Sequence, residues 1–287
     1  MHASRKKRGN SESALLQVAN VKKSARARRS GSARPAPTPR SGVGPGAIEI
    51  TVENGYMLAT LDRPAAGNRI SAAMAGELME LAETVEDDDS ICALAITGAG
   101  SVFSLGSDED VDLRFVETLA LISKPTLAIL NGDALDEGLE LAIALDLRAA
   151  TAGARFGLAQ LQRGILPHFG GTQRLPRMIG AAAALQMILT GDSIRADEAM
   201  RLGLLTYLAP DRKKLVQVAR ELLETLVTRG PLGVRMVKDA VRKGVDMTLE
   251  QGVRLEEDLY ALLQTTADRA EGVRAFLEKR KPLFKGA

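Results

Sequence analysis

The chain has 287 residues and a formal net charge of +2; 45% of its residues are hydrophobic and 26% are charged, which is ordinary for a globular protein. Aromatic residues make up only 3% and tryptophan is absent, which argues against a surface that stacks single-stranded nucleic acid. One cysteine, Cys92, and two histidines argue against a disulfide, a cysteine-rich zinc site and a multi-histidine metal centre. We therefore expect no metal. No apolar run reaches the ~20 residues of a membrane span, so we also expect no membrane partner.

The first 46 residues differ from the rest in charge and composition. They hold eleven Lys or Arg and one Glu, a net charge of +10, whereas the remaining 27 basic and 35 acidic residues give −8. Because segment 1–46 has too little apolar content to offset the entropy of ordering, it is predicted to be a disordered basic tail. Four explanations of this segment stay open: a solubilising tail, a nucleic-acid contact, an organelle transit segment and an upstream start-site error. We expect a cytoplasmic protein, or one of an organelle matrix if the tail is a transit segment.

A hairpin and a helix are predicted next. Apolar residues alternate with polar ones over 48–52 and again over 57–61, and Asn54-Gly55 lies between the two runs. This pairing is typical of a two-residue hairpin turn, because both turn positions need positive φ. Ser71 is a suitable N-cap for a helix. Its expected buried face follows at helical spacing: Met74, Leu78, Leu81, Ala82 and Val85.

Strands and helices then alternate, which indicates an α/β layer architecture. The predicted strands are 91–97, 126–130 and 148–151, and the predicted helices between them are 111–122 and 138–147. From Gly171 onward the pattern is almost entirely helical, with amphipathic stretches at 220–227, 232–245, 249–263 and 267–279. We therefore expect an α/β core over 47–205 and a helical C-terminal module over 206–287.

Two strand-to-helix junctions, 98–108 and 131–140, are the candidate chemical features. Such junctions leave unpaired backbone N–H groups at a helix start, where partial positive charge favours an anion. Two of them converging could form a two-donor oxyanion hole; ordinary glycine-containing turns are the alternative. A dinucleotide-binding fingerprint starting at Gly98 fails, because its sixth position is Phe103 instead of glycine.

Several motifs, in order and with consistent spacing, carry a family resemblance. They are Val102–Asp108, Lys124–Gly132, Gly138–Ala142, Asp146, Pro167–Pro176, Leu189–Asp192, Gly203-Leu204 and Phe276–Phe284. On these motifs the stretch from about Ile48 to Phe284 resembles the enoyl-CoA hydratase/isomerase, or crotonase, superfamily. The first 46 residues lie outside the resemblance.

The resemblance implies a crotonase-like α/β fold, a spiral of ββα units with a helical C-terminal trimerisation module. It therefore assigns the CoA thioester and catalytic site to 47–205 and oligomerisation to 206–287. The implied assembly is a homotrimer or a dimer of trimers. The implied substrate is an acyl-CoA, with coenzyme A present only as part of the substrate and no separate cofactor. The expected function is an acyl-CoA enzyme of the enoyl-CoA hydratase/isomerase type, with lyase activity expected first.

Site residues are carried over by position. The resemblance implies that the N–H groups of Leu105 and Glu137 polarise the thioester carbonyl, and that Glu140 transfers a proton. Without the resemblance, Glu140 would be a first-turn glutamate stabilised by the helix dipole. The expected CoA and substrate contacts are Ala66, Arg69, Leu105, Gly106, Ser107, Asp108, Phe276 and Lys279, the last two acting across a subunit boundary.

The chain departs from the family pattern at the second catalytic position. Gln160 stands where a second glutamate is expected, and glutamine can position a water or a substrate oxygen but cannot transfer a proton in ordinary acid–base chemistry. Four possibilities stay open. Three are reactions: hydration with Glu140 alone, isomerisation by one carboxylate, and thioester hydrolysis. The fourth is a catalytically degenerate acyl-CoA binder or scaffold with a nucleic-acid-binding tail. Glu137, beside Asp136, replaces the usual glycine, and only fifteen residues, Glu109–Ser123, separate Asp108 from Lys124.

Overall fold

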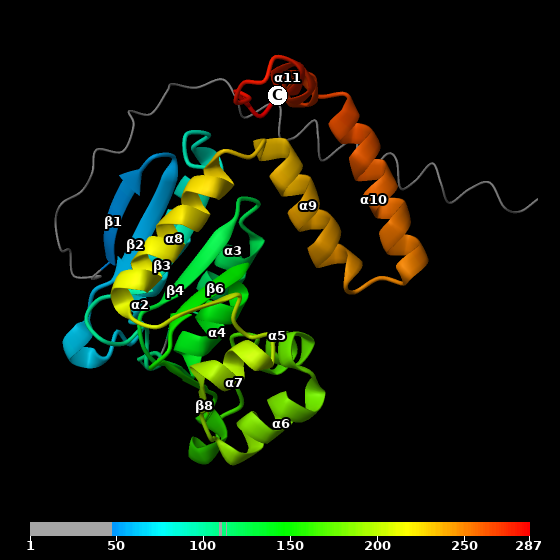
Figure 1. The fold of residues 1–287 in the computed structure, drawn as a ribbon. Helices are drawn as coiled ribbons and strands as arrows, with labels where there is room; N and C mark the ends of the chain where they lie inside the picture. The colour runs from blue at the N-terminus through cyan, green and yellow to red at the C-terminus, as the bar shows by residue number, and fades with distance from the viewer. Residues whose placement is uncertain (1–47, 109–110, 113) are drawn as a thin grey trace, which may run out of the picture. The chain divides into compact units, whose positions relative to one another are not determined.

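The computed structural model describes residues 48–108, 111–112 and 114–287 (Figure 1). The described residues fall within one compact unit that spans 39–287. The predicted basic tail over 1–46 lies outside the described residues. No helix in the described part of the chain is long and apolar enough to cross a membrane.

The chain enters the sheet through the predicted hairpin. Strands β1 (Ile48–Glu53) and β2 (Tyr56–Leu61) pair antiparallel, and Glu53 faces Tyr56 across the turn. The two turn residues have φ of 47° at Asn54 and 85° at Gly55. Both values are positive, as a primed hairpin turn requires, so the hairpin prediction is confirmed.

The main sheet has six strands in the order β1-β2-β3-β4-β6-β9. From β2 onward all neighbours are parallel. The further strands are β3 (Ala93–Gly98), β4 (Thr126–Leu130), β6 (Leu147–Thr151) and β9 (Tyr207–Ala209). The inner strands are buried almost throughout, because a parallel sheet is covered by helices on both faces.

Alternating side chains divide the sheet between two apolar layers. In β3, Leu94 and Ile96 belong to the larger core cluster, whereas Ala93 and Ala95 belong to a second cluster. The larger cluster contains residues of α2 (Ala72–Asp87), α3 (Arg114–Leu121) and α4 (Glu137–Ala144). The second contains Leu215, Ala219 and Leu223 of α8 (Arg212–Val227). The sheet is thus packed between helices, and the α/β prediction is confirmed (Figure 1).

Helix α2 begins where its sequence predicted. The Ser71 side chain accepts a hydrogen bond from the Met74 N–H at 3.2 Å, which is the expected N-cap. All five residues of the predicted apolar face are buried.

A second, three-stranded sheet carries the chain toward the site. Its order is β5 (Ala134–Leu135), β7 (Arg155–Gly157) and β8 (Ile194–Arg195). The short helices η1 (Pro64–Ala66) and η2 (Gln160–Arg163) and the helices α5 (Gly171–Ile179), α6 (Ala181–Thr190) and α7 (Ala196–Arg201) complete this part. The strand-strand-helix order recurs in β1-β2-α2 and β4-β5-α4; the spiral arrangement of such units stays a prediction.

The C-terminal helices are α9 (Pro231–Gly244), α10 (Leu249–Gln264) and α11 (Ala267–Leu277). The predicted end of the α/β core at residue 205 is too early, because β9 pairs with β6 and α8 packs on the sheet. Three-residue β9 carries too short a pattern to be read from the sequence. Asp146 connects α9 to the core: it accepts from the Thr126 N–H at 2.8 Å and pairs with Lys238 at 2.6 Å and Arg242 at 2.8 Å.

Candidate active site

The two strand-to-helix junctions, 98–108 and 131–140, lie against each other. The Leu135 N–H donates to the Ser104 carbonyl at 2.9 Å, and the Phe103 and Ser104 N–H groups donate to the Asp133 carbonyl at 3.0 and 3.2 Å. A Cβ on Gly138 would lie 2.3 Å from the Ser104 carbonyl oxygen. Glycine at 138 therefore permits the first junction to lie against the start of α4.

The start of α4 offers one of the two expected oxyanion donors. Within the described residues, the Glu137 N–H has no hydrogen-bond acceptor, so it presents the positive end of the helix to the site. The Leu105 N–H instead donates to the Gly67 carbonyl at 3.0 Å. A neighbouring loop carbonyl thus satisfies this N–H in the structure, and its role as an oxyanion donor stays a prediction.

Asp136 does not add negative charge to the site. Its carboxylate accepts from the Ala159 N–H at 2.7 Å and pairs with Arg163 at 2.8 Å. Asp136 has φ 49° at the N-cap of α4, a conformation that Asp and Asn adopt more readily than most residues. Its role in the described structure is to join the helix start to η2.

Glu140 is fully buried and is held by donors that carry no charge. Its Oε1 accepts from the Phe169 N–H at 2.8 Å and the Gly171 N–H at 2.7 Å, and its Oε2 accepts from Gln160 Nε2 at 3.0 Å. The pKa of this carboxyl is raised to about 7, mainly by burial and also by the nearby charge of Glu137, while the two N–H donors and His168 oppose the shift. Glu140 can therefore take or give a proton near neutral pH.

Gln160 lies against Glu140, as its expected position required. It is fully buried at the start of η2, and its Nε2 also lies 3.4 Å from Glu137 Oε1. Its Oε1 has no hydrogen-bond partner within the described residues. A buried amide oxygen without a partner is costly, so this atom is the point where a water or substrate donor would be stabilised.

The Glu137 side chain also faces the site, which the sequence reasoning missed. Its Oε2 accepts from the Ser107 N–H at 3.0 Å, and the side chain is buried in spite of its charge. We had assigned only the backbone of this residue. The three-residue spacing from Glu140 was the available signal, since residues three apart lie on one helix face.

The loop 105–108 is braced from within. Arg69 donates to the Leu105 carbonyl at 3.1 Å and to the Ser107 carbonyl, and it lies 3.6 Å from Asp108. The Arg69 guanidinium is thus engaged with this loop, and its expected contact with CoA stays a prediction.

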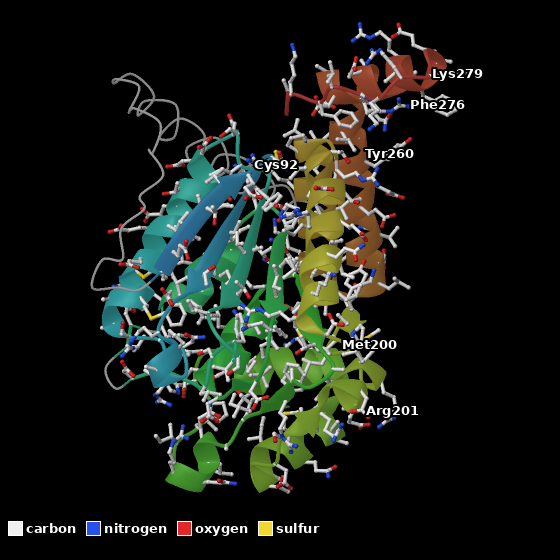
Figure 2. The ribbon with its side chains drawn as sticks, turned by 60° about the vertical axis from the view of Figure 1, so that its left-hand side comes forward. Cys92, Met200, Arg201, Tyr260, Phe276 and Lys279 are labelled. Atoms are coloured by element: carbon white, nitrogen blue, oxygen red, sulfur yellow. The ribbon has the colours of Figure 1, made fainter. Side chains whose placement is uncertain are left out.

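The remaining expected CoA contacts divide into two groups. Ala66 lies in η1, and its carbonyl accepts the Arg69 N–H at 3.4 Å; Gly106 has φ 125° within the braced loop. Phe276, 83% exposed, and Lys279 lie at and beyond the end of α11 (Figure 2). None of their described hydrogen bonds joins them to Glu137, Glu140 or Gln160, so a role at the CoA end across a subunit boundary stays a prediction.

One group of described residues has the composition of a metal site. Glu137, Glu140 and His168 each offer a ligand atom, and these atoms lie within 4.8 Å of one another. His168 is exposed, and its Nδ1 lies 3.1 Å from the Leu166 carbonyl oxygen. Both oxygens of Glu140 already accept from N–H donors. This donor set fits proton transfer better than metal coordination.

Comparisons with known proteins agree with the fold. The family model for enoyl-CoA hydratase/isomerase matches residues 51–287. The 2,3-dehydroadipyl-CoA hydratase of Escherichia coli is 37% identical over 250 residues, covering 83% of this chain and 98% of the relative. The short-chain-enoyl-CoA hydratase of Clostridium acetobutylicum is 33% identical over 250 residues, covering 82% and 95%.

The solved structure of an enoyl-CoA hydratase from Bacillus anthracis superposes with a TM-score of 0.80 at 32% identity, covering 84% of this chain and all of that one. Three findings support one conclusion: the family model matches nearly all of the described residues, the relatives match along almost their whole length, and the fold is shared. The chain belongs to the enoyl-CoA hydratase/isomerase family.

Proposed function

We propose that this chain acts on an acyl-CoA thioester and stabilises its enolate, with Glu140 as the group that moves a proton to or from the α-carbon. One observation carries the proposal: Glu140 is fully buried, oriented by three N–H donors, and has a pKa raised to about 7. A carboxyl poised near the working pH is suited to general acid–base catalysis.

The start of α4 is the proposed oxyanion site. The Glu137 N–H has no acceptor within the described residues and lies at the positive end of the helix, where a developing enolate oxygen gains most. The second donor would be the Leu105 N–H, which must exchange the Gly67 carbonyl for the thioester oxygen when substrate binds. The braced loop 105–108 would then border the CoA.

Water addition to an enoyl-CoA is the reaction we propose first. The named relatives are hydratases of enoyl-CoA substrates, and the unpartnered Gln160 Oε1 can accept a hydrogen bond from a water beside Glu140. Double-bond isomerisation is the second candidate, because Gln160 cannot transfer a proton and isomerisation requires only one carboxylate. We expect neither a metal nor a separate cofactor.

Assembly is the remaining part of the proposal. Helices α9 and α10 bury no residue completely within the chain, and apolar side chains on them stay exposed: Val237, Val241, Leu249, Tyr260 and Leu262. Exposed apolar surface of this kind favours an interface, so we propose that these helices join copies of the chain in a trimer-based assembly.

The test uses crotonyl-CoA and a 3-enoyl-CoA with product separation. Hydration gives 3-hydroxyacyl-CoA, isomerisation gives the 2-enoyl isomer, and hydrolysis releases CoA thiol. We expect Glu140→Gln to lower turnover by about 10²- to 10⁴-fold, the usual contribution of one general acid–base, while acyl-CoA binding measured by calorimetry persists. Turnover that survives this substitution would show that Glu140 is not the proton carrier.

A further inference from the structure

We propose that Glu137 is a second acid–base carboxylate of this site and supplies the proton transfer that Gln160 cannot. This inference rests on the proposed function and assigns to the helix α4 both carboxylates needed for water addition. A residue that by position should contribute only a backbone N–H would thereby also contribute its side chain.

The geometry brings Glu137 to the reacting region. Its Oε2 is anchored by the Ser107 N–H at 3.0 Å, which leaves Oε1 directed toward the Gln160 amide at 3.4 Å. The same Nε2 lies 3.0 Å from Glu140 Oε2. One neutral amide group thus lies between two buried carboxylates, and the carbonyl oxygen of that amide has no partner within the described residues.

The electrostatics divide the work between the two carboxylates. The charge of Glu137 is one of the causes that raise the pKa of Glu140. Neighbouring carboxyl groups with different surroundings commonly act as separate acid and base. Glu140, which holds its proton to about pH 7, is the acid, and Glu137 is the base.

The reaction balances with these two groups and water alone. Glu137 takes a proton from the water as its oxygen forms a bond to the β-carbon of the enoyl thioester. The π electrons move to the carbonyl, and the enolate then takes the Glu140 proton at the α-carbon. Glu137 ends protonated and Glu140 ionised, and proton exchange with solvent resets the pair.

The same order of proton transfers explains why the Glu137 carboxylate can lie beside the enolate oxygen. An ionised Glu137 would oppose the negative charge of an enolate held at its own N–H. Because Glu137 becomes neutral as that charge develops, the number of negative charges at the start of α4 stays constant through the step.

Two reactions separate this inference from the proposed function. Exchange of the α-protons of butyryl-CoA in heavy water, read by mass spectrometry, needs only carbonyl polarisation and Glu140. Hydration of crotonyl-CoA also needs the base that activates water. Glu137→Gln keeps the size of the side chain, and Asp136→Asn is the matched control, since Asn tolerates the same φ and keeps an acceptor for the Ala159 N–H.

We expect Glu137→Gln to slow hydration by at least about 100-fold and to affect α-proton exchange at least about tenfold less than hydration, while Asp136→Asn leaves both near wild type. Adding Gln160→Glu to Glu137→Gln should recover hydration by at least about tenfold. The apparent pKa for α-proton exchange should also fall in Glu137→Gln, because a charge that raises the pKa of Glu140 is removed.

Hydration by Glu137→Gln that equals the control would overturn the inference, as would a wild type that exchanges α-protons but adds no water. Absence of α-proton exchange in the wild type, or its survival in Glu140→Gln, would instead overturn the proposed function. The two failures are therefore distinguishable.

Discussion

Glu140 in α4 and Glu271 in α11 are held by backbone N–H donors, yet their acidities diverge. Glu271 accepts from the Leu283 N–H at 2.9 Å and from Arg280 and Arg274 at 2.6 to 3.2 Å. Those partners lower its pKa to about 2. Glu140 has N–H donors but no arginine among its hydrogen-bond partners, and its pKa is raised to about 7.

The difference teaches what distinguishes a structural carboxylate from a reactive one in this fold. Backbone donors lower the pKa of both carboxyls, so they do not account for the difference between them. Cationic partners favour the charged form, whereas burial with neutral donors favours the protonated form. Glu271 in α11 therefore stays ionised at neutral pH, whereas Glu140 in α4 can exchange its proton near neutral pH.

The largest expected effect concerns the stability of the protein with Glu140→Gln. Because the folded-state pKa of about 7 lies above the ordinary glutamate pKa of 4.5, the unfolded chain releases this proton first as pH rises, and wild-type stability falls between those values. At about 1.4 kcal/mol per pH unit, the variant should gain about 3 kcal/mol by about pH 8 and nothing below about pH 4.5.

Urea unfolding across this pH range measures the gain, with Glu117→Gln at an exposed position of α3 as control. Equal stability of Glu140→Gln and wild type near pH 8 would mean that the carboxyl is not raised in the folded protein, and the contrast with Glu271 would disappear.

A smaller effect is expected from Gly171→Ala. This variant tests whether the position of the Glu140 carboxylate matters for turnover as well as its pKa. A Cβ there would lie 2.8 Å from Glu140 Oε1 and 3.0 Å from Leu158 Cδ1. The flexible carboxylate must move, so we expect turnover to fall about 10- to 100-fold with little change in melting temperature. Gly153→Ala, which meets no atom within 4 Å, is the control, and equal activity of the two variants would contradict the prediction.

At the other end of the comparison, Glu271→Gln should lower the melting temperature at neutral pH by a few degrees. Its folded-state pKa of about 2 lies below the ordinary glutamate pKa of 4.5. The carboxylate therefore stabilises the fold above about pH 4.5, and this stabilisation is lost as pH falls toward about 2. Calorimetry should show the variant and wild type converging in acid.

Glu278→Gln provides the contrast for that measurement, because Glu278 pairs with the same Arg280 at 2.6 Å on an exposed side chain. Exposed pairs contribute little, so this variant should match wild type. A larger loss in Glu278→Gln than in Glu271→Gln would show that the arginine network, and not the backbone-anchored carboxylate, stabilises the C-terminal segment.

The smallest expected effect is none: dialysis against EDTA should leave turnover and melting temperature unchanged. Glu137, Glu140 and His168 could offer ligand atoms, but both Glu140 oxygens accept from N–H groups. Activity lost to EDTA and restored by Mn²⁺ or Zn²⁺ would replace the proton-transfer interpretation with a metal site.

Local patterns predicted the elements that depend on local interactions. The Asn54-Gly55 turn and the Ser71 cap follow from the conformations and donors of those residues alone. Strands β7 and β9 are three residues long and form by pairing with distant strands, so no alternation in the sequence marks them.

The site divides in the same way. The family resemblance assigned Glu140 and Gln160 to one site, and the Gln160 amide lies 3.0 Å from the Glu140 carboxylate. The Glu137 side chain was missed, because its orientation depends on an N–H that comes thirty residues earlier. The engagement of Leu105 with Gly67 likewise depends on how two loops meet, which residue types do not specify.

Both glutamates stand on one turn of α4, whereas Gln160 comes from η2. Helical hydrogen bonding holds the Cα atoms of residues three apart at a nearly constant separation. A movement of the segment 158–170 would therefore shift the Gln160 amide and the Phe169 N–H without changing the distance between the Cα atoms of Glu137 and Glu140. The spacing of the pair is therefore encoded within residues 137–140, whereas its orientation depends on the N–H groups of Ser107, Phe169 and Gly171.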